Sequence, residues 1–67
     1  MTLVELMTAA PPNTVVYSEQ AWAAARKSQA GRDEWFIDFG AYSPTRGTLT
    51  SAQMVEWTRW IFMVPAP

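Results

Sequence analysis

The sequence predicts a small α+β domain in which a sheet of two or three strands packs against two or three helices. Three patterns lead to this prediction: residues 34–39 carry a large apolar side chain at every second position, two capping-box motifs precede apolar segments, and prolines and glycines separate the segments. The 67 residues are interpreted as a single domain, residues 1–67, because they contain no internal repeat and no low-complexity linker. The alternative is an all-α domain of three helices, with residues 34–39 as an extended connection.

The N-terminal segment is expected to form a helix and then a strand. Thr2 and Glu5 have the spacing of a capping box, which predicts a helix over about residues 3–10. Pro11 and the proline after it cannot continue a helix, so the helix ends there. Residues 14–17 are β-branched or aromatic and therefore favour a strand.

Residues 19–30 are predicted to form the second helix. Ser18 suits the N-cap position, because its hydroxyl can accept a hydrogen bond from a backbone N–H of the first turn. The alanines of the segment have high helix propensity, and Gly31 ends it. If the strands before and after this helix are parallel neighbours, the helix forms a right-handed crossover between them.

Residues 34–39 form the clearest strand of the sequence. Successive side chains of a strand point to opposite faces, so one face carries Trp35, Ile37 and Phe39, and we expect it to be the core face. The opposite face then carries Glu34, Phe36 and Asp38. Residues 48–50 are expected to return as a third strand that pairs with this one.

The C-terminal segment is predicted to be the last helix. Thr50 and Gln53 form the second capping box, which opens a helix from about residue 51 to residue 63 that ends before Pro65. Its apolar residues follow the spacing of one helical face and are Met54, Trp57, Trp60, Ile61 and Val64.

The core of so short a chain is small, because a domain of about 60 residues buries only about 60% of the surface that its unfolded chain exposes. The sequence has no cysteine for a disulfide, and it has neither cysteine nor histidine for a structural zinc site. Oligomerisation or the binding of a partner is therefore the expected additional source of stability.

The residue inventory predicts that the protein is not an enzyme and holds no cofactor or metal. No imidazole or thiol is present for proton transfer or nucleophilic attack near neutral pH. The best carboxylate pair, Glu34 and Asp38, lies roughly 13 Å apart along a strand, which is wide for acid–base catalysis. We therefore expect no catalytic residues and no small-molecule substrate.

Charge and hydropathy also restrict the class of partner. The formal net charge is −1, and the basic residues are dispersed, so nucleic-acid binding through Arg26, Lys27 and Arg32 is only the third hypothesis. No window approaches the about 20 apolar residues of a membrane span, and we expect no membrane segment.

An aromatic surface is the predicted binding site for another protein or for a second copy of the chain. The run from Trp60 to Val64 is apolar throughout, which indicates that both sides of this segment are covered, by the domain's own core, by a second copy or by another protein. Phe36 lies opposite the predicted core face, between two carboxylates, where it is either an interface anchor or covered by the N-terminal helix. The candidate contact residues are Phe36, Trp57, Trp60 and Phe62, with Arg46, Glu34 and Asp38 at the rim.

The leading functional hypothesis is a non-catalytic interaction protein, of the kind that phages and mobile elements use to bind and inhibit or modulate a host protein by occlusion. The runner-up is a structural subunit, such as a virion decoration protein or another homo-oligomeric assembly protein. The first hypothesis predicts a cytoplasmic protein, in the host cell if it is phage-encoded, and the second predicts a location in the virion.

Overall fold

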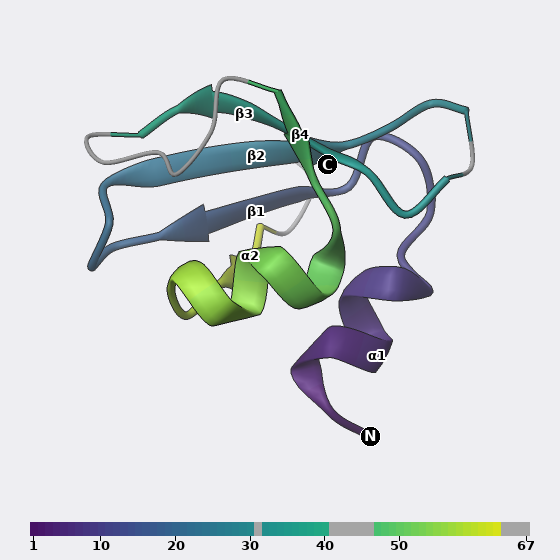
Figure 1. The fold of residues 1–67 in the computed structure, drawn as a ribbon, viewed down its shortest axis with the longest axis horizontal. Helices are drawn as coiled ribbons and strands as arrows, with labels where there is room; N and C mark the ends of the chain where they lie inside the picture. The colour runs from purple at the N-terminus through teal and green to yellow at the C-terminus, as the bar shows by residue number, and fades with distance from the viewer. Residues whose placement is uncertain (31, 41–46, 64–67) are drawn as a thin grey trace.

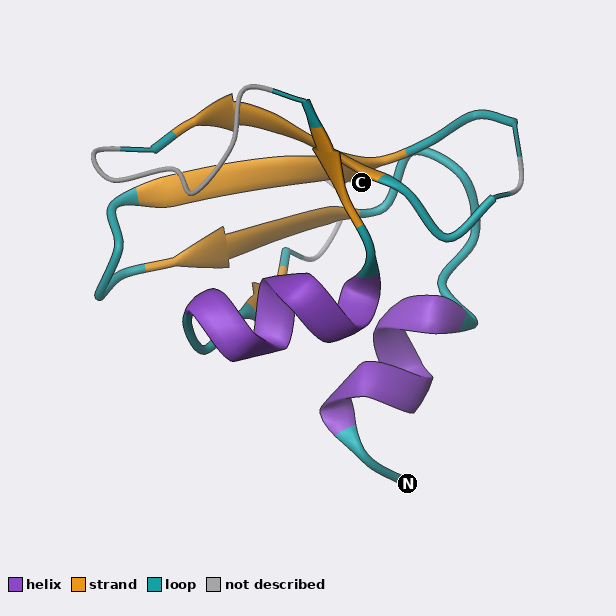
Figure 2. Cartoon of the chain, viewed as in Figure 1, coloured by secondary structure: helices purple, strands orange, loops and turns teal. Residues whose placement is uncertain are grey.

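The computed structural model describes residues 1–30, 32–40 and 47–63 (Figure 1). These residues form a five-stranded sheet with the strand order β4-β3-β2-β1-β5, and every pairing in it is antiparallel. The elements are α1 (Leu3–Thr8), β1 (Val15–Ser18), β2 (Ala23–Lys27), β3 (Trp35–Phe39), β4 (Thr48–Leu49), α2 (Ser51–Trp57) and β5 (Ile61–Phe62). Both helices lie on the same side of the sheet (Figure 2). We call the side toward the helices the inner face and the other side the outer face.

The predicted fold class is wrong in the size of the sheet, which has five strands instead of two or three. The all-helical alternative is wrong too, because the described residues contain two short helices beside this sheet. The conditional parallel crossover is also absent from the described residues: β2 lies between β1 and β3 and pairs antiparallel with both. The main source of these differences is the segment that follows β1.

Residues 19–30 form a turn and a strand instead of the predicted helix. The Ser18 hydroxyl does accept a hydrogen bond from the Ala21 N–H, at 3.2 Å, as an N-cap would. The chain then turns back through Trp22, which has a φ of 48°, and continues as β2. In this central strand the small side chain of Ala24 lies between Tyr17 and Phe39. The packing of these large side chains on either side of the alanine outweighs its helix propensity.

The elements with the strongest local patterns are confirmed. α1 begins at the Thr2–Glu5 capping box, and both reciprocal hydrogen bonds are present. α2 begins at the equivalent box of Thr50 and Gln53. The strand predicted over 34–39 is β3, and the residues after Gly47 return as β4, which pairs with it.

The last predicted helix is wrong in its second half, because α2 ends at Trp57. Thr58 is extended, with φ −162° and ψ 173°, and its hydroxyl lies 2.9 Å from that of Ser18. The chain then pairs with β1 as β5, so that Ile61 lies opposite Tyr17. The backbone N–H and C=O groups on this edge of β1 thereby form hydrogen bonds with β5. A helix at this position would leave them unpaired.

The core lies between the inner face of the sheet and the two helices. Its largest side chain is the fully buried Trp35, and the Trp60 ring packs edge-on against Trp57 with a centroid distance of 5.4 Å. Gly40 leaves room for Trp57, because a Cβ on this glycine would lie 3.1 Å from the indole. The buried apolar residues are Met7, Val16, Ala23, Ala25, Trp35, Leu49, Met54 and Trp60.

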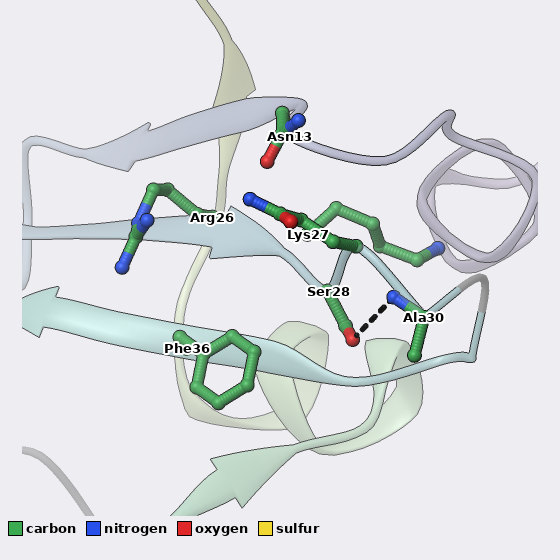
Figure 3. Close-up of a pocket in the computed structure, with 7 residues that line it drawn as sticks. Asn13, Arg26, Lys27, Ser28, Ala30 and Phe36 are labelled. Atoms are coloured by element: carbon green, nitrogen blue, oxygen red, sulfur yellow. Dashed lines mark hydrogen bonds between the residues drawn. The ribbon is translucent and has the colours of Figure 1, made fainter.

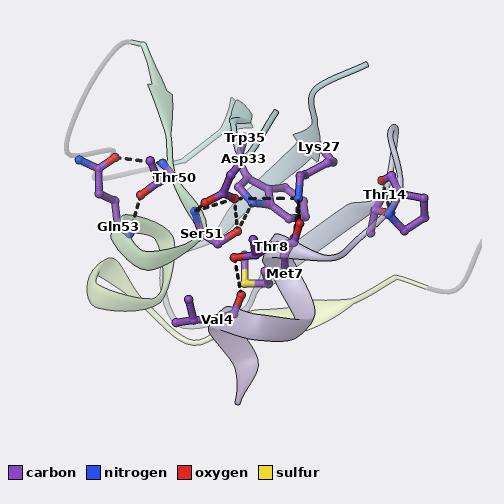
Figure 4. A network of polar contacts seen from close by, with 11 residues as sticks. Val4, Met7, Thr8, Thr14, Lys27, Asp33, Trp35, Thr50, Ser51 and Gln53 are labelled. Atoms are coloured by element: carbon purple, nitrogen blue, oxygen red, sulfur yellow. Dashed lines mark hydrogen bonds and ion pairs between the residues drawn. The ribbon is translucent and has the colours of Figure 1, made fainter. Parts of the chain in front are cut away.

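A buried polar network joins α1 to the sheet (Figure 4). Lys27 extends from the inner face of β2 and is 3% exposed. Its ammonium donates to the carbonyl oxygens of Met7 at 2.6 Å and Thr8 at 2.9 Å, which belong to the last turn of α1. The same ammonium lies 5.1 Å from the centroid of the Trp35 ring.

The network continues from Trp35 to the start of α2. The Trp35 indole N–H donates to the Ser51 hydroxyl oxygen at 2.9 Å, and the Ser51 hydroxyl donates to the Asp33 carboxylate. An Asp33 oxygen also lies 3.9 Å from the Lys27 ammonium. This network therefore ties α1, β2, β3 and α2 together in a chain that has no cysteine.

Candidate functional site

The outer face of the sheet is the candidate functional site. Side chains alternate along each strand, so every residue next to an inner-face residue points to the other side. The strand registers then place on the outer face Val15, Tyr17, Ala24, Arg26, Phe36, Asp38, Phe39, Thr48 and Ile61. Among the described residues, no helix covers this face (Figure 2).

A bulge in β3 adds Phe39 to the outer face, although the alternation predicts it to be core. Ala25 pairs with Ile37, whereas Ala24 pairs with Phe39, so Asp38 is an extra residue in the ladder. A bulge of this kind changes the direction of the side chain that follows it. Phe39 is accordingly 54% exposed, and the prediction that it belongs to the core is wrong.

The apolar side chains of the outer face lie side by side across the strands. Ile61, Tyr17, Ala24 and Phe39 occupy one row from β5 to β3. The next row brings Phe36 beside Arg26. Phe36 is 44% exposed and Ile61 is 56% exposed, so the face offers large apolar side chains to solvent.

An ion pair lies next to these apolar side chains. The Arg26 Nε donates to an Asp38 oxygen at 3.1 Å, and the two side chains are 52% and 39% exposed. Within the described residues, the terminal amino groups of the Arg26 guanidinium make no hydrogen bond. They therefore remain able to donate to an acceptor from outside the chain.

Two hollows that are lined by described residues open near this face. The larger, which we call the Arg26 hollow, has a volume of about 360 Å³ and is lined by Asn13, Arg26, Lys27, Ser28, Gln29, Ala30 and Phe36 (Figure 3). The smaller has a volume of about 150 Å³ and is lined by Tyr17, Glu19, Gln20, Arg59 and Ile61. Both hollows combine an aromatic ring with an arginine.

The structure does not bring the predicted contact residues together. Phe36 and Asp38 lie on the outer face, and Glu34 is half-buried just before β3. Phe62 lies opposite Val16 on the inner side and is 39% exposed. Arg46 lies outside the described residues, as do the predicted helix ends at Gly31 and Pro65 and the last apolar position, Val64.

Trp57 and Trp60 belong to the side of the helices, away from Phe36. Trp60 is 2% exposed, and its indole N–H donates to the Met54 carbonyl oxygen at 2.7 Å, so it is a core residue without a surface for a partner. Trp57 is half-buried against the same core. The apolar run that begins at Trp60 therefore consists of one core residue, Trp60, and of residues that belong to the edge strand β5 or follow it.

Most residues of the outer face are missed by the sequence prediction of the site, among them Tyr17, Arg26, Phe39 and Ile61. Tyr17 and Arg26 are missed because the helix predicted over 19–30 conceals their pairing in adjacent strands. Ile61 is assigned to a helical face, and Phe39 is assigned to the core. One feature of the sequence does indicate this face: Phe36 lies opposite the predicted core face of its strand, between the carboxylates of Glu34 and Asp38.

The described residues contain no group of three or more carboxylates that could hold a metal ion. Every buried side-chain polar atom within these ranges has a hydrogen-bond partner. Neither of the two described helices has the length and apolarity needed to cross a bilayer.

Comparisons with protein-family models, with curated protein sequences and with solved structures each find no match to this chain. Function is therefore inferred from the residues of the chain and their geometry. The outer face and its two hollows supply the basis of that inference.

Proposed function

We propose that the protein is a non-catalytic interaction module that binds another protein through the outer face of its sheet. The observation that carries this proposal is the group of exposed apolar side chains, Phe36, Phe39 and Ile61, that shares the outer face with the Arg26–Asp38 ion pair. Binding through this face covers the partner's surface and acts by occlusion. An accessory protein of a phage or mobile element that inhibits or modulates a host protein would work in this way.

The composition of the face suits a protein partner. Large aromatic side chains with polar neighbours are typical of interface hot spots. Phe36 and Phe39 are such side chains, and burying their exposed area is worth about 25 cal/mol per Å². The neighbouring ion pair has no net charge, so the face attracts neither a strongly acidic nor a strongly basic surface as a whole.

The size of the molecule favours a reversible complex over a permanent one. The two longest extents of the Cα trace are 26 and 25 Å, so the backbone projects onto a flat partner over roughly 650 Å². A standard interface uses about 800 Å² per partner, and permanent interfaces are larger. We therefore expect a partner that binds and dissociates.

Nucleic acid is a weaker candidate partner because the three basic residues do not form an exposed cluster of unpaired positive charge. Of the three basic residues proposed as phosphate contacts, Lys27 is 3% exposed and donates to carbonyls of α1. Arg26 is paired with Asp38. Arg32 alone does not provide the cluster that displaces counterions from a phosphate backbone.

The proposal is tested by affinity capture with matched surface variants. Phe39→Ser and Ile61→Ser each remove an apolar side chain from the outer face, whereas Leu6→Ser removes one of similar exposure, 43%, from α1. We expect the two outer-face variants to lose the captured protein and the Leu6 variant to retain it. Equal capture by all three folded variants contradicts the proposal.

The second candidate is self-association, which the edge strand β5 favours. The Met63 N–H donates to the Val15 carbonyl oxygen at 2.9 Å. Backbone groups alternate in direction along a strand, so the N–H and C=O of Phe62 point away from β1, toward the edge of the described sheet. A second copy could pair there, as in a structural subunit.

Light scattering during size exclusion distinguishes the two candidates. Self-association predicts a stable oligomer from low to high micromolar concentration, and it predicts that the Phe62→Pro variant is a monomer. Proline at this position removes an N–H donor that faces the sheet edge, but it spares the hydrogen bonds with β1. A monomer at every concentration contradicts self-association.

A further inference from the structure

We propose that the Arg26 hollow is the anchor point for the partner protein and takes an acidic side chain from an extended segment of it, with an apolar residue beside the carboxylate. This inference rests on the proposed function, because it names the chemistry that the outer face recognises. It draws on the arginine, the aromatic wall and the free amides of the hollow.

The guanidinium of Arg26 is prepared to bind a carboxylate. Asp38 accepts a hydrogen bond from Nε at 3.1 Å, which orients the planar group and leaves its terminal amino groups for another acceptor. A carboxylate can accept from two donors of a guanidinium at once, and Arg presents them in a fixed geometry. Less rotational freedom is lost on binding because Asp38 already restrains the side chain.

The same Asp38 limits the strength of the site. Its charge repels an incoming carboxylate, although its 39% exposure allows solvent to screen this repulsion. Long-range attraction therefore contributes little, and recognition depends on the paired hydrogen bonds and on apolar contact. This balance fits the reversible complex that we propose.

The walls of the hollow fit a short peptide segment. Phe36 forms an apolar wall near Arg26 (Figure 3). Within the described residues, the side-chain amides of Asn13 and Gln29 make no hydrogen bond, so each can pair with a peptide group of the partner. The volume of about 360 Å³ is at the small end for ligand sites and holds one side chain with its flanking atoms.

Asn13 is held in place at the rim by the backbone. Its φ is 67°, a left-handed value that asparagine tolerates better than most residues, and its N–H donates to the Lys27 carbonyl oxygen at 3.1 Å. The position of this amide is thus set by the fold before any partner arrives. A phosphate would meet the same repulsion from Asp38, and it would find no second cation beside Arg26, because the Lys27 ammonium is turned toward α1.

The test is an NMR titration of the full-length, isotope-labelled chain with three probes. The first is a capped tripeptide with glutamate between two leucines, the second has glutamine in place of glutamate, and the third is a short oligothymidylate. The peptides are added up to about 10 mM, which covers the millimolar affinity expected of so small a ligand.

We expect the glutamate peptide to shift, in a saturable manner, the signals of Asn13, Ser28, Gln29 and the Arg26 Nε–H. The glutamine peptide should bind about 10-fold more weakly, because it lacks the charge that strengthens the hydrogen bonds. Arg26→Lys should weaken the glutamate peptide about 10-fold, since an ammonium cannot form the paired contact. Arg59→Lys, in the smaller hollow, is the matched control and should leave the affinity unchanged.

Three results overturn the inference: no saturable shift in this hollow, equal affinity for the two peptides, or equal effects of the two arginine variants. Stronger and localised shifts with oligothymidylate also overturn it and assign the hollow to nucleic acid. If protein capture depends on Phe39 and Ile61 but not on Arg26, the proposed function stands and the anchor fails. If capture depends on none of them, both fail.

Discussion

The two faces of the sheet place neighbouring residues in opposite environments. Trp35 is fully buried, whereas Phe36 beside it is 44% exposed. Lys27 is enclosed by the last turn of α1, whereas Arg26 beside it is half-exposed and pairs with a single carboxylate. The inner residue of each pair holds the fold together, and the outer residue is available for contact.

The inner face also explains how so small a chain is stabilised without a disulfide or a zinc site. Its buried polar network connects both helices to the sheet through Lys27, Asp33, Trp35 and Ser51. Such a network is costly when incomplete, because each buried polar group that loses its partner keeps its desolvation penalty. Substitutions on the two faces should therefore differ in their effect on stability.

The largest difference is expected between Trp35 and Phe36. Trp35→Ala should lower the free energy of unfolding by about 3–5 kcal/mol, because it leaves a cavity in the core. A small domain has little more than this in total, so the variant should be largely unfolded. Phe36→Ala should cost about 1 kcal/mol or less. Urea denaturation followed by circular dichroism measures both, and equal losses would contradict the distinction between the faces.

The second comparison uses the basic neighbours. Lys27→Met keeps the aliphatic stem but removes the donor for the carbonyls of Met7 and Thr8, and should cost about 2–3 kcal/mol. Arg26→Met removes an exposed ion pair and should cost no more than about 0.5 kcal/mol. Thermal and chemical denaturation of the two variants in parallel provide the measurement. A larger loss in the Arg26 variant would show that the outer ion pair supports the fold.

A smaller effect is expected at the start of α2. Ser51→Ala leaves the Trp35 indole N–H without its acceptor and should cost about 1–2 kcal/mol. Its matched control is Ala52→Ser at the next, exposed position, where we expect a change within about 0.5 kcal/mol. Hydrogen exchange of the Trp35 indole, followed by NMR, should accelerate in the first variant alone. Unchanged exchange in Ser51→Ala would exclude this hydroxyl as a stabilising acceptor.

The smallest expected effect has the opposite sign and lies in the turn between β1 and β2. Trp22 combines a left-handed φ of 48° with an exposure of 68%. Trp22→Gly should raise stability by about 0.5 kcal/mol, because glycine adopts this conformation without strain. Ala21→Gly, where no such strain exists, should lower it by about 0.5–1 kcal/mol. A melting-temperature comparison is sufficient, and a destabilised Trp22 variant would show that the indole supports the fold.

Part of the fold and of the candidate site could be predicted because the responsible interactions are local. Both helices begin at capping boxes, whose hydrogen bonds join residues three positions apart. The alternation around Phe36 is equally local, and it indicates β3 and an aromatic side chain between two carboxylates. These features are encoded within a few consecutive residues.

The tertiary structure alone decided the rest, because the deciding partners are distant in the sequence. β2 is a strand since its alanines fit between the large side chains of β1 and β3, against their own helix propensity. The chain leaves the helix after Trp57 because the edge of β1 offers backbone partners to β5. Arg26 and Phe39 reach the outer face only through these pairings and the bulge in β3, so no pattern of neighbouring residues could have assigned them to it.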